Sequence, residues 1–419
     1  GEPGIGKTRL AAELATSALE AGHHVVFGRN GEDLQVPYQP FIEVIRQTIG
    51  SGSAPLDDLG LAPLFPDLAA GRPLGPATGQ SESADDSESR RYRLFEAIAQ
   101  WLTDQAEQRP LTMIVDDVHW ATDSTLQLLH HLQRRPGTAA VTFILTARDT
   151  APDINQRVAD LLAASQGESH HTVTRLGGLP SDQAVRLVSD DLDLDHVMQQ
   201  TAGNPLLLQA VNPDDGTVDM HSAVRRRLAR LDKNVQETLR LMSVLGLEFE
   251  LRVAATANHR DELDLLDDLE MAVAARLLDD VGRDRFRFTH ALVRSSLRDE
   301  LSSARRTRMH QRVAEAIEEV FPDDPRLLPE LAFHSAAAAA SITSLRPRAI
   351  ACLRLAAREA MVQLSFEEAT ALTERARALV DPADSHLAAS LALEQGIAEL
   401  RSGRNMVAAR TFGEAISAA

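Results

Sequence analysis

The chain has 419 residues and a formal net charge of −18, with 61 acidic residues against 43 basic ones. This length exceeds that of an ordinary single domain, so we expect about three or four domains. The acidic balance argues against non-specific nucleic-acid binding by the whole chain. A single cysteine, Cys352, excludes an internal disulfide framework and zinc sites built from several cysteines, and we interpret it as a small buried hydrophobic residue.

Targeting signals are missing from the sequence. No apolar run approaches the ~18 residues of a membrane-spanning helix, and no signal peptide opens the chain. We therefore expect a cytoplasmic protein without a membrane partner. The sequence begins inside a motif rather than with Met and ends within a helical pattern at Ala419, which we interpret as a fragment open at both ends.

Strand and helix signals alternate from Gly1 to about Arg175. Short apolar runs predict strands at 25–28, 111–115 and 140–146. Helices are predicted before the first of these strands, at 8–21, and between the strands, at 38–49, 92–107 and 124–134. This alternation indicates an α/β fold with a parallel sheet covered by helices. Residues 71–90, rich in Gly, Pro, Ser and acids, are predicted to form a mobile loop.

The first eight residues, GEPGIGKT, fit the P-loop pattern G-x-x-x-x-G-K-[ST]. Gly1, Gly4 and Gly6 permit turns that aim backbone N–H groups at phosphate oxygens. Lys7 would place a cation on the β- and γ-phosphates, and Thr8 would offer its hydroxyl to Mg²⁺. We predict that ATP or ADP with Mg²⁺ is bound by Gly1, Glu2, Pro3, Gly4, Ile5, Gly6, Lys7, Thr8 and Arg9.

A P-loop normally follows directly on a strand inside the sheet. That strand would lie before Gly1, so the predicted fold is a P-loop domain whose sheet lacks its first strand. We expect the 419-residue chain to bind ATP weakly or to fold poorly for this reason.

Two acids and an arginine stand at the ends of predicted strands. Asp116 and Asp117 follow the apolar run 111–115, at the sheet edge where ligands bind in such folds. Asp116 would hold Mg²⁺, and Asp117 would orient or deprotonate an attacking water. Arg148 closes the next strand, where it could sense a γ-phosphate. An ordinary strand end with two solvated acids and a surface arginine are the alternatives that the pattern leaves open.

Helical patterns dominate after residue 176. Helices are predicted at 181–190, 222–230, 234–245 and 302–321. The alternating run Arg285–Phe288 suggests the wing of a winged-helix domain. The spacing of Ala369, Thr373 and Ala376 recurs 39 residues later, as Ala408, Phe412 and Ala415. This repeat resembles tetratricopeptide repeats, although any array of helical hairpins could produce it.

These segments predict four domains. They are a P-loop nucleotide-binding domain at 1–175, a small helical domain at 176–220, a winged-helix domain at 221–300 and truncated tetratricopeptide-like repeats at 301–419.

Several of these segments together resemble one known family, the signal-transduction ATPases with numerous domains (STAND), and within it the large ATP-binding regulators of the LuxR type. The matching segments are GEPGIGKTRLAAELA, VPYQPFIEVIR, RRYRLFEAIAQWL, IVDDVHWATDSTLQLLHHL, TFILTARD, TAGNPLLLQAV, RRLARLDKNVQETLRLMSVLG and FRFTHALVRSSLRDELSSARRTRMHQRVAEAIE. IVDDVHWA is the most specific of them.

The resemblance implies roles for individual residues. Gly203–Asn204–Pro205 matches the family's G-x-P motif, so Pro205 would pack near the adenine. Arg148 matches the sensor arginine, and His290 resembles the winged-helix histidine that touches the β-phosphate of ADP. Family members often have His-Asp where this chain has His290–Ala291. A coincidental turn is the alternative for Gly203–Pro205.

The resemblance also implies a switch that hydrolyses ATP slowly, with Lys7, Asp117 and Arg148 as its catalytic residues. ADP would hold the domains closed, whereas a protein or small-molecule signal on the helical repeats would favour ATP, opening and self-association. DNA would be bound only through a domain absent from this chain. A sensor or scaffold ATPase with another output, such as a nucleotide cyclase, is the alternative. A P-loop kinase is less favoured, because the double acid after an apolar strand and the long helical tail do not suit an enzyme that needs an acceptor pocket and a closing lid.

Overall fold

The computed structural model describes residues 1–34, 36–49, 60–65, 84–135, 140–148, 156–164, 171–188, 192–212, 216–322 and 324–419. These residues form two compact units, each assembled from segments that are distant in sequence. The first unit contains residues 1–7, 174–327 and 337–343, and the second contains 8–173, 328–336 and 344–419.

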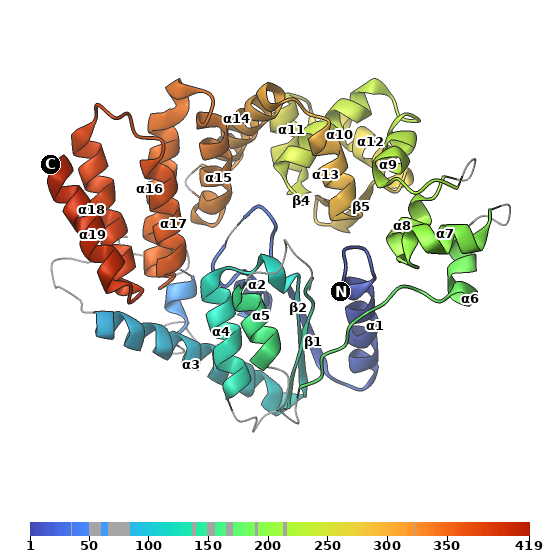
Figure 1. The fold of residues 1–419 in the computed structure, drawn as a ribbon, viewed down its shortest axis with the longest axis horizontal. Coiled ribbons are helices and arrows are strands. Elements are labelled where there is room, and N and C mark those ends of the chain that lie inside the picture. Colours follow the sequence, from blue (N-terminus) through green and yellow to red (C-terminus); the bar gives the residue numbers. More distant parts are fainter. Residues whose placement is uncertain are drawn as a thin grey trace. The chain divides into compact units, whose positions relative to one another are not determined.

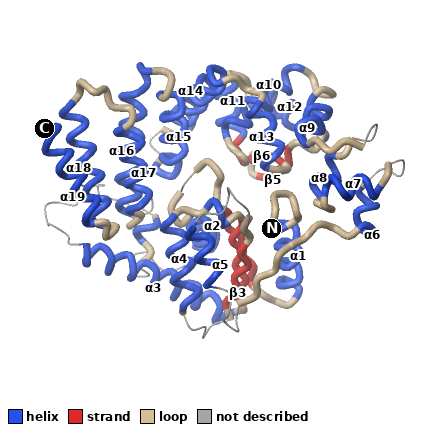
Figure 2. The backbone as a smooth tube through the Cα atoms, viewed as in Figure 1, coloured by secondary structure: helices blue, strands red, loops and turns tan. Residues whose placement is uncertain are grey.

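A parallel sheet lies at the centre of the second unit (Figure 2). Its strands are β1 (His24–Arg29), β2 (Leu111–Asp116) and β3 (Val141–Leu145), and they lie in the order β1-β2-β3. Every residue of the central strand β2 is buried, as expected for a strand covered on both faces. The three predicted apolar runs and their parallel arrangement are therefore confirmed.

Amphipathic helices supply the rest of this unit's core. The elements are α1 (Lys7–Glu20), α2 (Gln39–Ile49), η1 (Ala62–Leu64), α3 (Ala84–Gln108), η2 (Val118–Trp120), α4 (Asp123–Arg134) and α5 (Gln156–Ala164). Phe41 of α2, Ile98 of α3 and Leu128 of α4 pack in one cluster with Met113 of β2. Thr122 caps α4, because its hydroxyl accepts the Thr125 N–H at 3.3 Å.

The prediction of a mobile loop over 71–90 is wrong at its carboxyl end, because α3 already begins at Ala84. The remainder of that prediction, up to residue 83, lies outside the described residues. Acidic residues such as Asp86 and Glu88 suit the positive end of a helix dipole, so a composition that resembles a polar loop also starts a helix.

The carboxyl-terminal part of the second unit is a stack of helical hairpins (Figure 1). Its helices are α16 (Arg346–Val362), α17 (Phe366–Arg377), α18 (Ser385–Arg401) and α19 (Asn405–Ala418). The two copies of the predicted repeat fall on α17 and α19, and Ala369 and Ala408 are both buried. A Cβ on Gly396 would lie 2.5 Å from the Phe412 ring, so a glycine there allows α18 and α19 to approach closely. The helical repeat is therefore confirmed.

The first unit is mostly helical. Its elements are α6 (Ser181–Ala184), η3 (Val185–Leu187), α7 (Leu194–Thr201), α8 (Pro205–Ala210), α9 (Met220–Leu228), α10 (Lys233–Leu245), β4 (Glu248–Glu250), α11 (Leu251–Asn258), α12 (Glu262–Ala274), β5 (Leu278–Gly282), β6 (Arg285–Phe288), α13 (Ala291–Asp299), α14 (Ser303–Val320) and η4 (Pro325–Leu327). The segments α15 (Leu328–Ala339) and η5 (Thr343–Leu345) are divided between the units.

Two sequence predictions can be compared with this unit. The predicted wing, Arg285–Phe288, is the central strand of an antiparallel sheet of order β4-β6-β5. The helix predicted over 181–190 is observed as α6 and η3 and ends at Leu187, because Val188 adopts an extended backbone, and residues 189 and 190 lie outside the described residues. Among the residues that the structure describes, no helix combines the length and apolar character needed to cross a membrane.

Candidate functional site

The Asp116 side chain at the carboxyl end of β2 is the centre of a polar network in the second unit. It is fully buried, and its carboxylate accepts hydrogen bonds from two hydroxyls. Thr8 Oγ1 lies 3.2 Å from Oδ1 and 3.1 Å from Oδ2, and Thr146 Oγ1 lies 2.5 Å from Oδ1. Residues predicted separately as the P-loop threonine and the strand-end acid are therefore adjacent, although 108 positions separate them in sequence.

Arginine and asparagine from the end of β1 complete this network. Arg29 donates from Nε at 3.3 Å and from Nη2 at 3.1 Å to Asp116 Oδ2. Asn30 donates from its backbone N–H at 3.2 Å and from Nδ2 at 3.1 Å to the Asp116 carbonyl oxygen. The backbone of Asp116 is thus fixed independently of its carboxylate.

The loop after β2 places Asp117 and Arg148 beside two aromatic rings. Asp117 has left-handed backbone angles (φ 55°, ψ 48°), and its N–H donates to Thr146 Oγ1 at 2.9 Å. The N–H of Arg148 donates to Nδ1 of the buried His119 at 3.4 Å. The guanidinium carbon of Arg148 lies 5.7 Å from the centroid of the Trp120 ring, a cation–π contact.

The glycine loop belongs to the first unit up to Lys7. Gly4 and Gly6 have φ values of +77° and +104°, which side-chain-bearing residues rarely adopt. Lys7 Nζ donates to the carbonyl oxygens of Gly1 at 2.9 Å and Glu2 at 2.8 Å. The loop therefore has the backbone turns that the motif predicts, with the lysine ammonium held against its own carbonyls.

The predicted Gly203–Pro205 motif contacts this loop within the same unit. Asn204 Nδ2 donates to the Pro3 carbonyl at 2.9 Å, and Asn204 Oδ1 caps α8 by accepting the Leu206 N–H at 3.1 Å. A Cβ on Gly4 would lie 2.6 Å from Leu206 Cβ. The two motifs, about two hundred positions apart, are thus packed against one another, with Pro205 as the first residue of α8.

Two further predicted site residues have local partners. His290 is the N-cap of α13, and its Nδ1 accepts the Leu292 N–H at 3.1 Å. Arg9 is exposed on α1 and forms an i,i+4 ion pair with Glu13. The structure therefore records these residues in roles that stabilise their own helices.

The donor chemistry around Asp116 fits Mg²⁺. A carboxylate and a threonine hydroxyl are the oxygen ligands that this ion prefers, and it keeps its remaining positions for water and phosphate oxygens. In the described part of the chain, no group of three or more His, Cys, Asp and Glu side chains could hold a metal by itself. Thr8 and Asp116 would therefore hold the ion together with a nucleotide's phosphates.

A helix of the hairpin stack contacts the first turn of α4 within the second unit. Glu368 on α17 is buried, and its carboxylate accepts the Ser124 N–H at 3.0 Å and the Ser124 hydroxyl at 2.6 Å. Beside it, Glu367 accepts from Arg91 Nη1 at 3.2 Å and from Gln127 Nε2 at 2.9 Å. Burial raises the pKa of Glu368, and the hydrogen bonds from Ser124 oppose that rise.

Apolar residues around the start of α17 belong to the same interface. Phe366 is fully buried in the cluster that includes Tyr38 and Phe95, and Leu364 accompanies it. The guanidinium carbon of Arg91 lies 5.6 Å from the Phe366 ring centroid. The hairpin stack and the sheet domain thus share one hydrophobic core.

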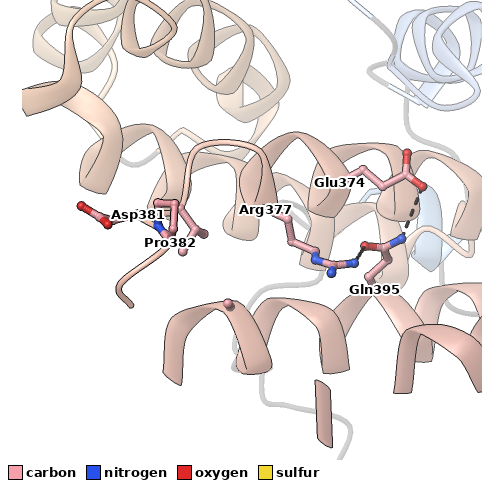
Figure 3. Close-up of a pocket in the computed structure, with 7 residues that line it drawn as sticks. Glu374, Arg377, Asp381, Pro382 and Gln395 are labelled. Carbon is pink, nitrogen blue, oxygen red and sulfur yellow. Dashed lines mark hydrogen bonds between the residues drawn. The ribbon is translucent and has the colours of Figure 1, made fainter. Parts of the chain in front are cut away.

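A cavity of about 380 Å³ lies in the α17–α18 hairpin (Figure 3). Arg377 Nη1 donates to Gln395 Oε1 at 2.7 Å, and Gln395 Nε2 donates to Glu374 Oε1 at 3.3 Å. Val380, Asp381, Pro382 and Ala388 line the rest. Its polar side chains are largely engaged with one another.

Sequence reasoning found Thr8, Asp116 and Asp117 but missed their partners. No motif marked Arg29, Thr146 or Glu368. For Arg29, a signal was present, because it directly follows the apolar run 25–28 and parallel neighbouring strands bring their carboxyl ends to one edge of the sheet. For Glu368, nothing in the local pattern distinguishes it from an ordinary surface acid.

Comparison with known proteins identifies the amino-terminal part. Residues 1–145 match the family model described as AAA ATPase domain. No curated protein matches the chain closely enough to count as a relative. Among solved structures, the chain is similar to the crystal structure of a Signal Transduction ATPase with Numerous Domains (STAND) protein with a tetratricopeptide repeat sensor from Pyrococcus horikoshii. The match has 14% identity and a TM-score of 0.37, and it covers 96% of this chain and 63% of that one. At this identity and TM-score, the likeness carries no argument about function.

Proposed function

From the match of residues 1–145 to the AAA ATPase domain model, we propose that this chain is an ATP-dependent signal-transduction switch of the STAND class. The observation that carries the proposal is the contact of Thr8 with Asp116, which joins the P-loop threonine to the acid at the end of β2. A threonine hydroxyl beside a buried carboxylate is the pair that holds Mg²⁺ on a nucleotide in P-loop proteins. We propose that Lys7 binds the phosphates and that Asp117 orients the water for slow hydrolysis.

The remaining roles follow from residues that flank the site. A bound Mg²⁺ would supply charge neutralisation for the transferred phosphoryl group. Arg148 would sense the γ-phosphate by leaving the Trp120 ring, its partner in this structure. The contact of Asn204 with Pro3 supports a position for Pro205 at the nucleotide's base. His290 is proposed as the residue that recognises the β-phosphate of ADP.

Regulation would act through the hairpin stack. Because Glu368 accepts two hydrogen bonds from the first turn of α4, a movement of α17 would be transmitted to the helix that follows Asp117 and η2. We propose that a signal on the repeats favours exchange of ADP for ATP and self-association. A LuxR-type transcription regulator is the proposed parent, and the domain boundaries at 175, 220 and 300 are part of this proposal.

Nucleotide binding by variants of the whole chain tests the function. Lys7→Ala should abolish binding of a fluorescent ADP analogue, whereas the exposed Lys233→Ala should bind like the wild type. Asp117→Asn should bind ATP but slow its turnover in a single-turnover assay, with labelled phosphate released to water rather than to an acceptor. Equal binding by Lys7→Ala and the wild type would contradict the proposal.

A further inference from the structure

Arg29 lies where β1 and β2 end side by side. The two strands are parallel, and their register pairs Arg29 directly with Asp116. The Arg29 side chain is 21% exposed, whereas the Asp116 side chain is fully buried. A guanidinium that solvent still reaches therefore supplies the positive charge next to a carboxylate that solvent does not reach.

The backbone of Arg29 is anchored to α2, whereas among the described residues its guanidinium contacts Asp116 and one aromatic ring. The Arg29 N–H donates to Glu43 Oε2 at 3.2 Å, and Glu43 Oε1 accepts from Gln39 at 3.0 Å. The guanidinium carbon lies 5.4 Å from the centroid of the half-exposed Phe27 ring. The side chain can therefore leave Asp116 toward solvent without disturbing the strand.

Charge decides what happens when a divalent ion arrives. Arg29 Nε and Nη2 both donate to Oδ2, Thr146 donates to Oδ1, and the Thr8 hydroxyl lies within 3.2 Å of both oxygens. An ion bound by Thr8 and Asp116 would bring two positive charges beside a third, and like charges repel one another strongly where solvent is excluded. The guanidinium and the ion are thus competitors for one carboxylate.

We propose that Arg29 is a positioning residue that substitutes for the divalent cation at Asp116 and must leave Oδ2 when Mg²⁺ binds with the nucleotide. This inference rests on the proposed nucleotide site. It assigns a function to a residue outside the P-loop motif and outside the Asp116–Asp117 pair. A substitution in β1 would then change the Mg²⁺ concentration that the switch requires. Removing the guanidinium weakens the metal-free state and strengthens Mg²⁺ binding.

The test uses the whole chain and two readouts besides turnover. Thermal unfolding is followed in EDTA, and Mg²⁺ is titrated into the ADP-saturated protein with calorimetric detection. Arg29→Gln should lower the melting temperature in EDTA and decrease the half-saturating Mg²⁺ concentration by about tenfold. Arg29→Lys keeps the charge but not the two-pronged geometry. Its melting temperature and its half-saturating Mg²⁺ concentration should lie between those of the wild type and of Arg29→Gln.

Arg354→Gln is the matched control. Arg354 makes a two-pronged ion pair with Glu394 that is also partly exposed, but this pair lies on the hairpin stack. The control should lower the melting temperature without changing the half-saturating Mg²⁺ concentration. If Arg29→Gln behaves in the same way, or raises that concentration, Arg29 does not compete with the ion and the inference is wrong.

The result also separates this inference from the proposed function. A wild type that binds no ADP at any Mg²⁺ concentration overturns both. ADP binding with an unchanged Mg²⁺ dependence in Arg29→Gln and Arg29→Lys overturns only the role of Arg29. If Arg29→Gln does not fold, Arg29→Lys decides the question, because an unaltered half-saturating Mg²⁺ concentration in that variant contradicts competition.

Discussion

Glu368 and Ser124, 244 positions apart in sequence, form a buried pair in which one carboxylate accepts both the backbone N–H and the hydroxyl of a serine. Ser124 lies in the first turn of α4, whose unpaired N–H groups and positive dipole favour a carboxylate. The acid comes from α17 rather than from the residue before the helix. A repeat helix thus completes the amino-terminal cap of a helix in the sheet domain.

Replacing Glu368 by Ala should destabilise the second unit. The change leaves the buried N–H and hydroxyl of Ser124 without an acceptor, which costs about 1–3 kcal/mol of unfolding free energy. Urea unfolding of the single variants and of Glu368→Ala/Ser124→Ala measures the coupling, expected at about 0.5–3 kcal/mol. Glu394→Ala provides a control on the outer hairpins. Additive effects of Glu368→Ala and Ser124→Ala would show that the pair contributes no coupling.

The pH dependence of stability should carry the signature of Glu368. Burial raises its pKa in the folded chain above the ordinary glutamate value, as burial also raises that of Asp123. Between the unfolded and folded pKa values, the folded state binds more protons, so stability falls as pH rises through this window. Denaturant unfolding across this pH window should show a smaller decline in unfolding free energy for Glu368→Gln than for the wild type. Identical slopes would rule out this titration as a contributor.

The apolar part of the same interface gives an independent prediction. Phe366 is fully buried among residues of the sheet domain, so Phe366→Ala removes a large side chain from a shared core. The expected loss is about 3–5 kcal/mol of unfolding free energy. Met406 on α19 is 86% exposed, and Met406→Ala should change stability by less than about 0.5 kcal/mol. Similar losses in both variants would contradict a core role for Phe366.

The sequence predicted the elements whose signals are local. The apolar runs at 111–115 and 140–146 became β2 and β3, and the glycine loop and Asp116 were recognised by spacing alone. Arg29 was missed because its importance depends on which strand lies beside β2, and no periodicity records that order. Glu368 was missed because burial of an acid depends on a helix far away in sequence. Long-range packing, rather than local propensity, decided these cases.

Gly4 provides the sharpest test of the contact between the glycine loop and the Gly203–Pro205 motif. Its φ of +77° costs a side-chain-bearing residue about 1–3 kcal/mol, and an added Cβ would lie 2.6 Å from both Cβ and Cδ2 of Leu206. Gly4→Ala should therefore lower the melting temperature and weaken ADP binding together. Gly413→Ala, on a helix with no atom close to the added Cβ, should be neutral or slightly stabilising.

A second substitution separates the two costs of Gly4→Ala. Leu206→Ala removes the Cδ2 atom that meets the new methyl group, but it leaves the Cβ and the backbone angle unchanged. Gly4→Ala/Leu206→Ala should therefore recover part of the ADP affinity relative to Gly4→Ala, and the strain in φ together with the remaining Cβ contact at position 206 should account for the rest. If Leu206→Ala lowers affinity equally in both backgrounds, the contact with Cδ2 does not limit binding. The backbone angle and the Cβ contact would then be the reasons for glycine at this position.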